Sequence, residues 1–191
     1  MKKWLIVSIL SVLAHPVFAA NWQVDNDLSS VSFISTKKGD IAEVHKFKQV
    51  SGTLDEQGKF SLTIDLASVD TGISIRDERM QGLLFEVAQY PTLTLSASVP
   101  PKLVNDLAVG STTVADIEAT IDLHGQQQKK VFKVLVAKLS DKKFMVTSLA
   151  PVVVQAQDFG LVAGVEKLRA IAGLSSISLA VPVSFVVGLH Q

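Results

Sequence analysis

The stretch Asp116–Leu123 reads Asp-Ile-Glu-Ala-Thr-Ile-Asp-Leu, with a polar or charged residue at every even position and an apolar residue at every odd one. Successive side chains of a β-strand point to opposite faces, so this segment predicts a strand with one apolar face and one solvent-facing face. On this basis we interpret Asp116, Glu118 and Asp122 as part of a solvated outer face, in preference to a carboxylate pair for acid–base catalysis.

The same alternation recurs along the chain, in segments separated by turn-forming residues. It covers residues 61–66 and 93–99, and it returns over residues 177–185 near the C-terminus. Strands that each have one apolar face have to pool those faces. A barrel or a sandwich does this, and a barrel also removes exposed sheet edges. We therefore expect a mainly β protein, built as a single antiparallel β-barrel of about eight strands.

The apolar spacing becomes helical over residues 74–88. This change predicts one substantial helix between two strands, with Ser74 as its N-cap and Asp77 as the acid of a capping box. A further one or two helical turns are expected within residues 164–173.

The first 19 residues have the pattern of a secretory signal peptide. Met1–Lys3 is basic, Trp4–Leu13 is apolar, and Val17–Ala19 has the small residues of a cleavage site. The alternative, an uncleaved membrane anchor, is disfavoured because the apolar run is shorter than the roughly 20 residues that a span needs. We expect cleavage near Ala19, a periplasmic location, and a mature domain over residues 20–191 without a membrane span.

Composition excludes several classes of function. The mature chain has 16 Lys and Arg against 18 Asp and Glu and no basic patch, so a nucleic-acid partner is not expected. There is no cysteine, and neither His124 nor His190 has a second histidine at metal-ligand spacing. The chain also lacks a Gly-x-Ser-x-Gly nucleophile motif. We predict no catalytic residues, no metal and no cofactor, and hence a protein that is not an enzyme.

Two polar features remain open to interpretation. His45 lies in a strand-like stretch, residues 42–54, and we interpret it as a solvent-facing or rim residue because polar residues of half-buried strands normally face water. Arg76 and Arg79 either hold a ligand's anionic head at a cavity mouth or pair with acids on the surface of the helix. The second interpretation is favoured, since charge runs on helices are usually solvated.

An ordered set of short motifs resembles the signature of the YceI-like family. The motifs span nearly the whole mature chain: Trp22–Asp25, Ser30–Phe33, Ser68–Thr71, Arg76–Met80, Leu84–Phe85, Tyr90–Pro91, Ile121–Gly125, Lys130–Val131 and Asp158–Leu161. The resemblance implies an extended, lipocalin-like barrel with a lid helix, in an exported bacterial protein of a family with members that hold a polyisoprenoid chain. The sequence departs from the family at Leu28–Ser29, where a histidine is common, and at Gln157, where a basic residue is common.

The expected function is therefore that of a non-catalytic periplasmic carrier of a long apolar molecule, such as a polyisoprenoid, a quinone tail or a similar lipid. The side chains expected to line the barrel interior are Phe33, Leu62, Ile64, Leu95, Ile117, Ile121, Leu179, Val183 and Phe185, with Arg76 and Arg79 as a possible polar rim. The alternative is a structural or stress-related interaction module with a filled core and no ligand. A homodimer is compatible with either.

Overall fold

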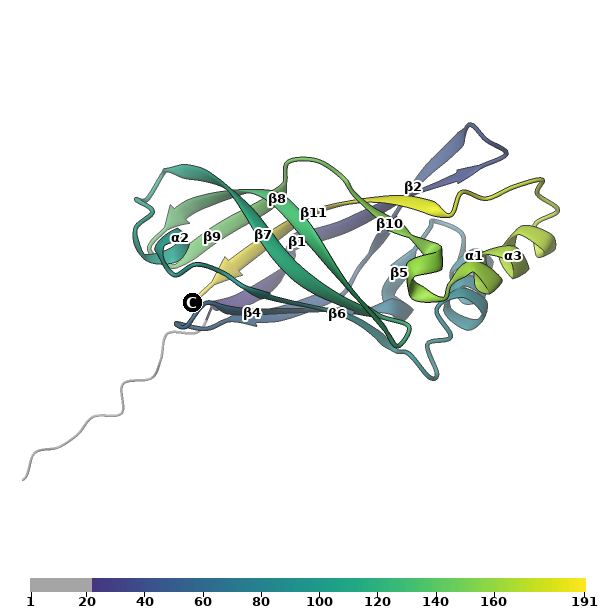
Figure 1. The fold of residues 1–191 in the computed structure, drawn as a ribbon, viewed down its shortest axis with the longest axis horizontal. Coiled ribbons are helices and arrows are strands. Elements are labelled where there is room, and N and C mark those ends of the chain that lie inside the picture. The colour runs from purple at the N-terminus through teal and green to yellow at the C-terminus, as the bar shows by residue number, and fades with distance from the viewer. Residues whose placement is uncertain (1–21) are drawn as a thin grey trace, which may run out of the picture.

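The computed structural model describes residues 22–191, so the predicted signal peptide lies outside the described residues. Eleven strands form one antiparallel sheet, and the pairing of β1 with β11 closes eight of them into a barrel (Figure 1). The prediction of an eight-stranded antiparallel barrel is confirmed. In the order in which they pair around the barrel, its strands are β1 (Trp22–Lys37), β3 (Val50–Leu54), β4 (Lys59–Asp65), β6 (Thr92–Ser98), β7 (Thr112–Leu123), β8 (Gln126–Ser140), β9 (Lys143–Ser148) and β11 (Ala180–His190).

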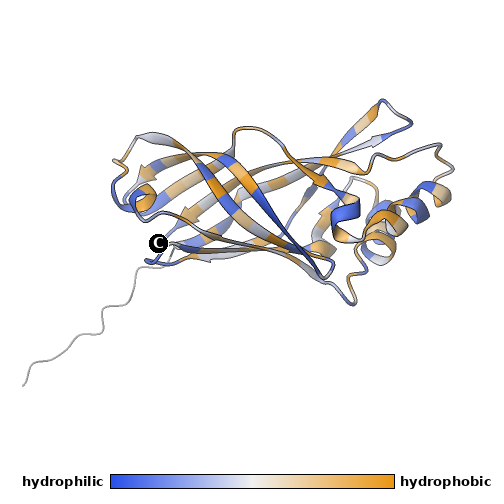
Figure 2. Cartoon of the chain, in the orientation of Figure 1, coloured by the Kyte–Doolittle hydropathy of each residue, from blue (hydrophilic) through white to orange (hydrophobic). Residues whose placement is uncertain are grey.

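The alternation of the sequence becomes the inside and outside of the barrel wall. Along β7, Ile121 and Leu123 are buried, whereas Asp116 and Glu118 are exposed. Glu118 accepts a hydrogen bond of 3.1 Å from Lys129 on β8, and both side chains remain largely in solvent. The bands of alternating hydropathy on the strands follow the same rule (Figure 2). The interpretation of these carboxylates as a solvated face is confirmed.

Three short strands extend the wall at one end of the barrel: β2 (Ile41–Phe47), β5 (Val69–Asp70) and β10 (Val152–Gln155). The first half of β1 pairs with β3 and the second half with β2, so the β1–β2 hairpin projects beyond the barrel (Figure 1). Between these halves the register of β1 against β11 shifts. Ser29 stabilises this shift in register, because its hydroxyl donates to the Asp25 carbonyl and accepts from the Gly188 amide. Ser29 belongs to the Leu28–Ser29 stretch, where the sequence departs from the family pattern.

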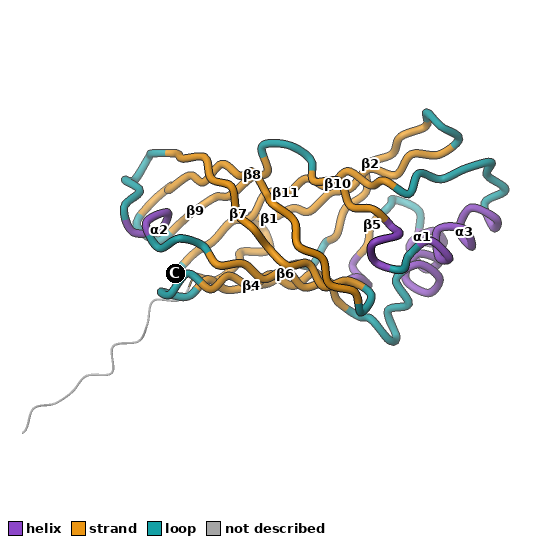
Figure 3. The backbone as a smooth tube through the Cα atoms, in the orientation of Figure 1, coloured by secondary structure: helices purple, strands orange, loops and turns teal. Residues whose placement is uncertain are grey.

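Helices close both ends of the barrel. At one end lie α1 (Ser74–Arg79), the π-helical turn η2 (Met80–Leu84) that continues it, and α3 (Val162–Ile171); we call these three elements the lid. At the other end, near the C-terminus, lies α2 (Lys102–Asn105) (Figure 3). Two 3₁₀ turns, Leu66–Ser68 and Ala156–Phe159, connect strands. Within residues 22–191, no helix combines the length and apolar character needed to cross a membrane.

The predicted helix is present, but its predicted N-cap is wrong. Ser74 is the first helical residue, and the N-cap is Ile73, whose side chain makes no capping hydrogen bond. Asp77 instead turns back to the chain that enters the helix, accepting hydrogen bonds from the Thr71 amide at 2.9 Å and the Thr71 hydroxyl at 2.5 Å. The carboxylate therefore fixes the angle at which the helix leaves β5.

The two parts of the lid pack backbone against backbone at Gly164. A Cβ atom at this position of α3 would lie 2.8 Å from both the Leu83 carbonyl oxygen and the Leu84 Cα of η2. Real Cβ atoms do not approach other atoms so closely, so only glycine permits this contact. Gly164 thus joins the second lid helix, which lies 80 residues later in the chain, to the first.

Candidate functional site

The barrel encloses a cavity of about 570 Å³. All eight barrel strands contribute inward apolar side chains to its wall, and the lid contributes Met80, Leu84, Val165 and Leu168. At the end opposite the lid, α2 contributes Leu103 and Val104. A filled-core module requires that no such cavity exists, so the geometry favours a container.

Eight of the nine expected interior residues line this cavity. They come from five different strands, and each occupies the inward position that alternation predicts: Phe33, Leu62, Ile64, Leu95, Ile117, Ile121, Val183 and Phe185. Their contact with a ligand stays a prediction, since their position in the wall is what the structure reports.

Leu179 is the exception, and its expected position was wrong. It packs half-buried against the core without lining the cavity, because β11 begins only at Ala180. The Ser178 hydroxyl donates to the Ala180 carbonyl at 2.9 Å and accepts from the Ala180 amide at 3.2 Å. This local ring of hydrogen bonds bends the chain at Leu179, and the alternation of side chains does not extend through the bend.

The polar lining of the cavity lies entirely at the lid end. Among the lining residues of the described chain, only seven are polar or charged: Ser35, Lys37, Glu43, His45, Arg76, Arg79 and Ser178. Arg76 and Arg79 are therefore at the mouth of the cavity. Arg76 pairs with an acid, as the second interpretation expects, but this acid is Glu43 of β2 and not a residue of the helix itself. Binding of an anionic head by the two arginines stays a prediction.

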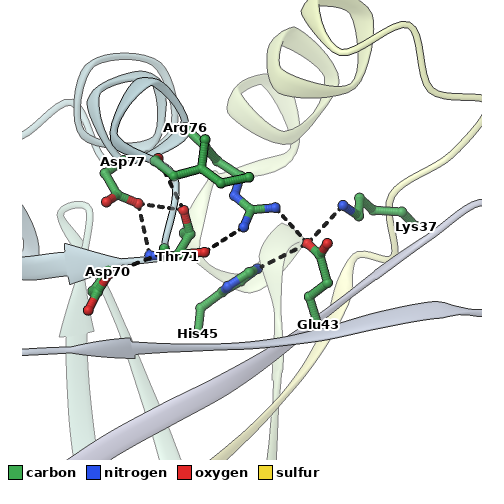
Figure 4. A network of polar contacts seen from close by, with 9 residues as sticks. Lys37, Glu43, His45, Asp70, Thr71, Arg76 and Asp77 are labelled. Atoms are coloured by element: carbon green, nitrogen blue, oxygen red, sulfur yellow. Dashed lines mark hydrogen bonds and ion pairs between the residues drawn. The ribbon is translucent and has the colours of Figure 1, made fainter.

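Glu43 is the centre of the polar cluster (Figure 4). Its Oε2 lies 2.8 Å from Lys37 Nζ and 2.6 Å from Arg76 Nη1, so two cations share one carboxylate oxygen. The hydrogen bonds from Lys37 and Arg76 hold the pKa of Glu43 below its ordinary value. Arg76 also donates to the Thr71 carbonyl at 2.6 Å. The cluster thus joins the β1–β2 hairpin to the lid.

His45 is buried, with only 3% of its surface exposed, and its interpretation as a solvent-facing or rim residue was wrong. Glu43, His45 and Phe47 are the inward positions of β2, and Val44, at 70% exposed, is the outward one. The His45 ring packs edge-on against Phe33 at a centroid distance of 5.4 Å. Burial, reinforced by the positive charge of Arg76, lowers the pKa of His45, so the imidazole is neutral at pH 7.

The hydrogen-bonding capacity of the cluster is not filled by the described chain. His45 Nδ1 and Arg76 Nε are buried and have no hydrogen-bond partner among residues 22–191. His45 Nε2 lies 3.8 Å from Glu43 Oε2, beyond hydrogen-bond distance. Buried polar atoms normally find partners. The polar cluster therefore contains two buried nitrogen atoms that the described chain leaves without a hydrogen-bond partner.

A hydrogen bond between Glu86 and His124 holds the other end of the lid. Glu86 and His124 are both in the left-handed backbone region, with φ of 49° and 54°. Glu86 Oε2 lies 3.1 Å from His124 Nε2, and the Tyr90 ring packs on the imidazole at 4.2 Å. The β7–β8 turn is thereby tied to the chain that follows η2. Within residues 22–191, no three His, Asp or Glu side chains gather as metal ligands.

Sequence reasoning missed Lys37, Glu43 and His45 as parts of the mouth. A signal was present: with Phe47 facing inward, period-two alternation places positions 43 and 45 inward as well. The apolar Val44 between them suggested the opposite facing. The inward positions 43 and 45 of β2 are polar because they face Arg76 of the lid helix α1 at this end of the barrel.

The fold and the sequence have close relatives among known proteins. A solved polyisoprenoid binding domain from Saccharophagus degradans, described as implicated in plant cell wall breakdown, is 39% identical, with a TM-score of 0.87 over 89% of this chain and 98% of that one. Burkholderia cenocepacia BcnA shares the fold at 20% identity, with a TM-score of 0.67 over 86% of this chain and 98% of that one.

A search of curated proteins finds no match. The YceI-like domain family matches residues 22–189, which is almost the whole described chain. The family assignment drawn from the ordered motifs is confirmed, and the chain belongs to the YceI-like family.

Proposed function

We propose that this protein is a non-catalytic periplasmic binding protein that holds one long apolar molecule, a polyisoprenoid or a lipid with a similar chain, inside its barrel. The observation that carries the proposal is the cavity: about 570 Å³, apolar along the barrel and polar only at the lid end. Its volume is typical of pockets that bind small ligands. A chain with an apolar tail and one polar head fits this distribution of side chains.

The energetics favour a flexible hydrocarbon guest. Apolar surface removed from water contributes about 25 cal/mol per Å², so a chain that buries several hundred Å² gains several kcal/mol. The ordering of the guest offsets part of this gain. The cavity wall provides apolar contact area rather than directed hydrogen bonds, so it selects for the length and cross-section of the ligand's hydrocarbon tail. The polar residues at the mouth select for the ligand's polar head.

Sequence similarity to a known binding domain supports the same proposal. The Saccharophagus degradans relative, 39% identical over nearly its whole length, is described as a polyisoprenoid binding domain. The periplasmic location rests on the pattern of residues 1–19.

The test is to express the full chain in a Gram-negative host, purify it from the periplasmic fraction and extract it with organic solvent for mass spectrometry. We expect an apolar molecule in stoichiometric amount and a mature N-terminus at Ala20. Ile121→Trp, which adds volume inside the cavity, should fold and lose the molecule. Val131→Trp, at a position on the outer face that is 61% exposed, is the matched control and should keep it.

Two results would contradict the proposal. One is a purified protein that contains no apolar molecule and takes up neither a polyprenyl nor a fatty-acid probe. The other is an Ile121→Trp variant that loses the fold, because a filled core, unlike a cavity, cannot accept the added volume.

A further inference from the structure

The cavity meets solvent at the lid end. Of the lining side chains in the described chain, only Arg79 and Ala172 are exposed, and both belong to this end. At the opposite end, Trp22 packs on Phe144 at a ring distance of 4.7 Å, and both side chains are buried. A guest that enters the barrel therefore passes between the lid and the β1–β2 hairpin.

Exposed aliphatic side chains lie on the elements that flank this opening. Ile41 and Val44 lie on β2, Ile73 and Ile75 lie at the start of α1, and all four are between 45% and 70% exposed. The 2.6 Å contact between Arg76 and Glu43 brings these two elements together, so the four side chains flank one ion pair. Ile171, at the end of α3 and next to Ala172, is exposed as well.

The concentration of these residues is local. We define the docking surface as residues 37–48, 70–79 and 162–178, the hairpin and lid segments that surround the opening. They make up less than a quarter of the described chain, but they carry five of its twelve exposed large hydrophobic side chains. Single exposed aliphatic residues are normal on a protein surface, whereas a group of them around a cavity mouth indicates contact with a partner.

The charge of the docking surface is opposite to that of the rest of the molecule. The surface carries eight Lys and Arg against six Asp and Glu, whereas the remainder of the mature chain carries eight against twelve. Lys38 and Lys46 lie on the hairpin with exposed side chains. Such a basic, aliphatic end complements a surface with anionic head groups and an apolar layer below them.

We propose that the docking surface binds the face of a lipid bilayer that contains anionic lipids, and that the cavity opens towards the membrane. The inference rests on the proposed function for one step. A water-insoluble guest has to leave or enter a bilayer, so the opening of the cavity should lie against the bilayer surface. The projecting β1–β2 hairpin places Ile41 and Val44 beyond the barrel wall, where aliphatic side chains can insert among lipid head groups (Figure 1).

The test is co-sedimentation of the exported, mature protein with vesicles. One set contains phosphatidylethanolamine and phosphatidylglycerol, and the other contains only phosphatidylcholine. We expect binding to the anionic vesicles that weakens as salt is raised. The double variant Val44→Ser/Ile75→Ser should reduce binding by about tenfold or more, because bound affinity scales with the apolar area inserted. The matched control, Val114→Ser/Val131→Ser, removes two exposed valines from the barrel wall and should bind as the wild type does.

The proposal is overturned by a wild-type protein that does not sediment with the anionic vesicles, and equally by two double variants that bind alike. It is also overturned if Val44→Ser/Ile75→Ser leaves vesicle binding intact but converts a dimer to a monomer in analytical ultracentrifugation, since the surface is then an interface between copies. Failure of the proposed function has a different signature, in which the protein binds vesicles but yields no apolar molecule on extraction.

Discussion

The Arg76 guanidinium of the lid helix donates a 2.6 Å hydrogen bond to the Glu43 carboxylate of β2, and this contact crosses the mouth of the cavity. The two residues are separated by 33 positions in the chain. Lys37 reaches the same carboxylate oxygen from β1. The lid is thus held to the hairpin by an ion pair that also forms part of the proposed ligand-binding site.

Breaking this contact should loosen the lid. Arg76→Ala removes one of two cations from Glu43, and we expect a loss of about 1 kcal/mol in the free energy of unfolding, since the pair is partly exposed. The larger effect should be a faster release of a bound fluorescent fatty-acid or polyprenyl probe. Lys129→Ala, which breaks the exposed pair with Glu118 on the barrel wall, is the control. Equal release rates for the two variants would show that the contact does not hold the lid.

The glycine contact between the lid helices should be essential for their packing. Gly164→Ala adds a Cβ atom 2.8 Å from the Leu83 carbonyl and the Leu84 Cα, so α3 has to move away from η2. We expect a loss of about 1–3 kcal/mol in urea unfolding, the usual effect of overpacking. Gly82→Ala is the matched control, because a Cβ atom there meets nothing within 4 Å. A Gly164→Ala variant as stable as Gly82→Ala would contradict the close contact.

Acidification should destabilise the protein in two stages. Burial lowers the pKa of His45 from its ordinary value of 6.5, so the unfolded chain takes up a proton that the folded protein does not, and stability falls as the pH drops below about 6.5. The pKa of Glu43 is lowered from 4.5, so its stabilising ion pairs are present above this pH and are lost as the pH falls through the folded-state value.

His45→Gln should reduce the dependence of the free energy of unfolding on pH in the first stage. The measurement is the urea midpoint of the wild type and the variant at several pH values between about 7.5 and 5. His124→Gln and His190→Gln serve as controls for the other histidines of the mature chain. If His45→Gln keeps the full wild-type slope, the first stage has another origin.

The closed end of the barrel should limit the length of the guest. Phe144 lines the cavity and packs on Trp22, so Phe144→Ala lengthens the cavity at the end away from the lid. We expect a preference for longer polyprenyl chains in competition binding, together with a loss of about 3–5 kcal/mol in stability. Trp22 is the single tryptophan of the mature chain, so its emission should shift to longer wavelength as its surroundings open. An unchanged chain-length preference would show that the ligand's tail does not reach the end of the cavity at Phe144.

The alternation of apolar and polar residues predicted strands with one apolar face, and the barrel was preferred to a sandwich because it has no exposed edges. A side chain on a regular strand has only two possible faces, so a run such as Asp116–Leu123 determines which residues point inward once one face is apolar. The eight predicted residues that line the cavity, Ile121 among them, all lie on regular strands. Leu179 failed because the Ser178 hydroxyl bonds to the backbone of Ala180 and bends the chain just before the strand, a local interaction that periodicity does not report.

The sequence by itself determined the strand faces and the family, because these follow from period-two patterning and from ordered local motifs. Only the tertiary structure decided that the barrel closes around a cavity, that Arg76 reaches Glu43 across its mouth, and that Gly164 brings a second helix onto the lid. These contacts join segments that are 33 to 80 positions apart in the chain. Their existence depends on how the hairpin, the lid and the barrel end meet in space, and no local pattern of residues specifies that meeting.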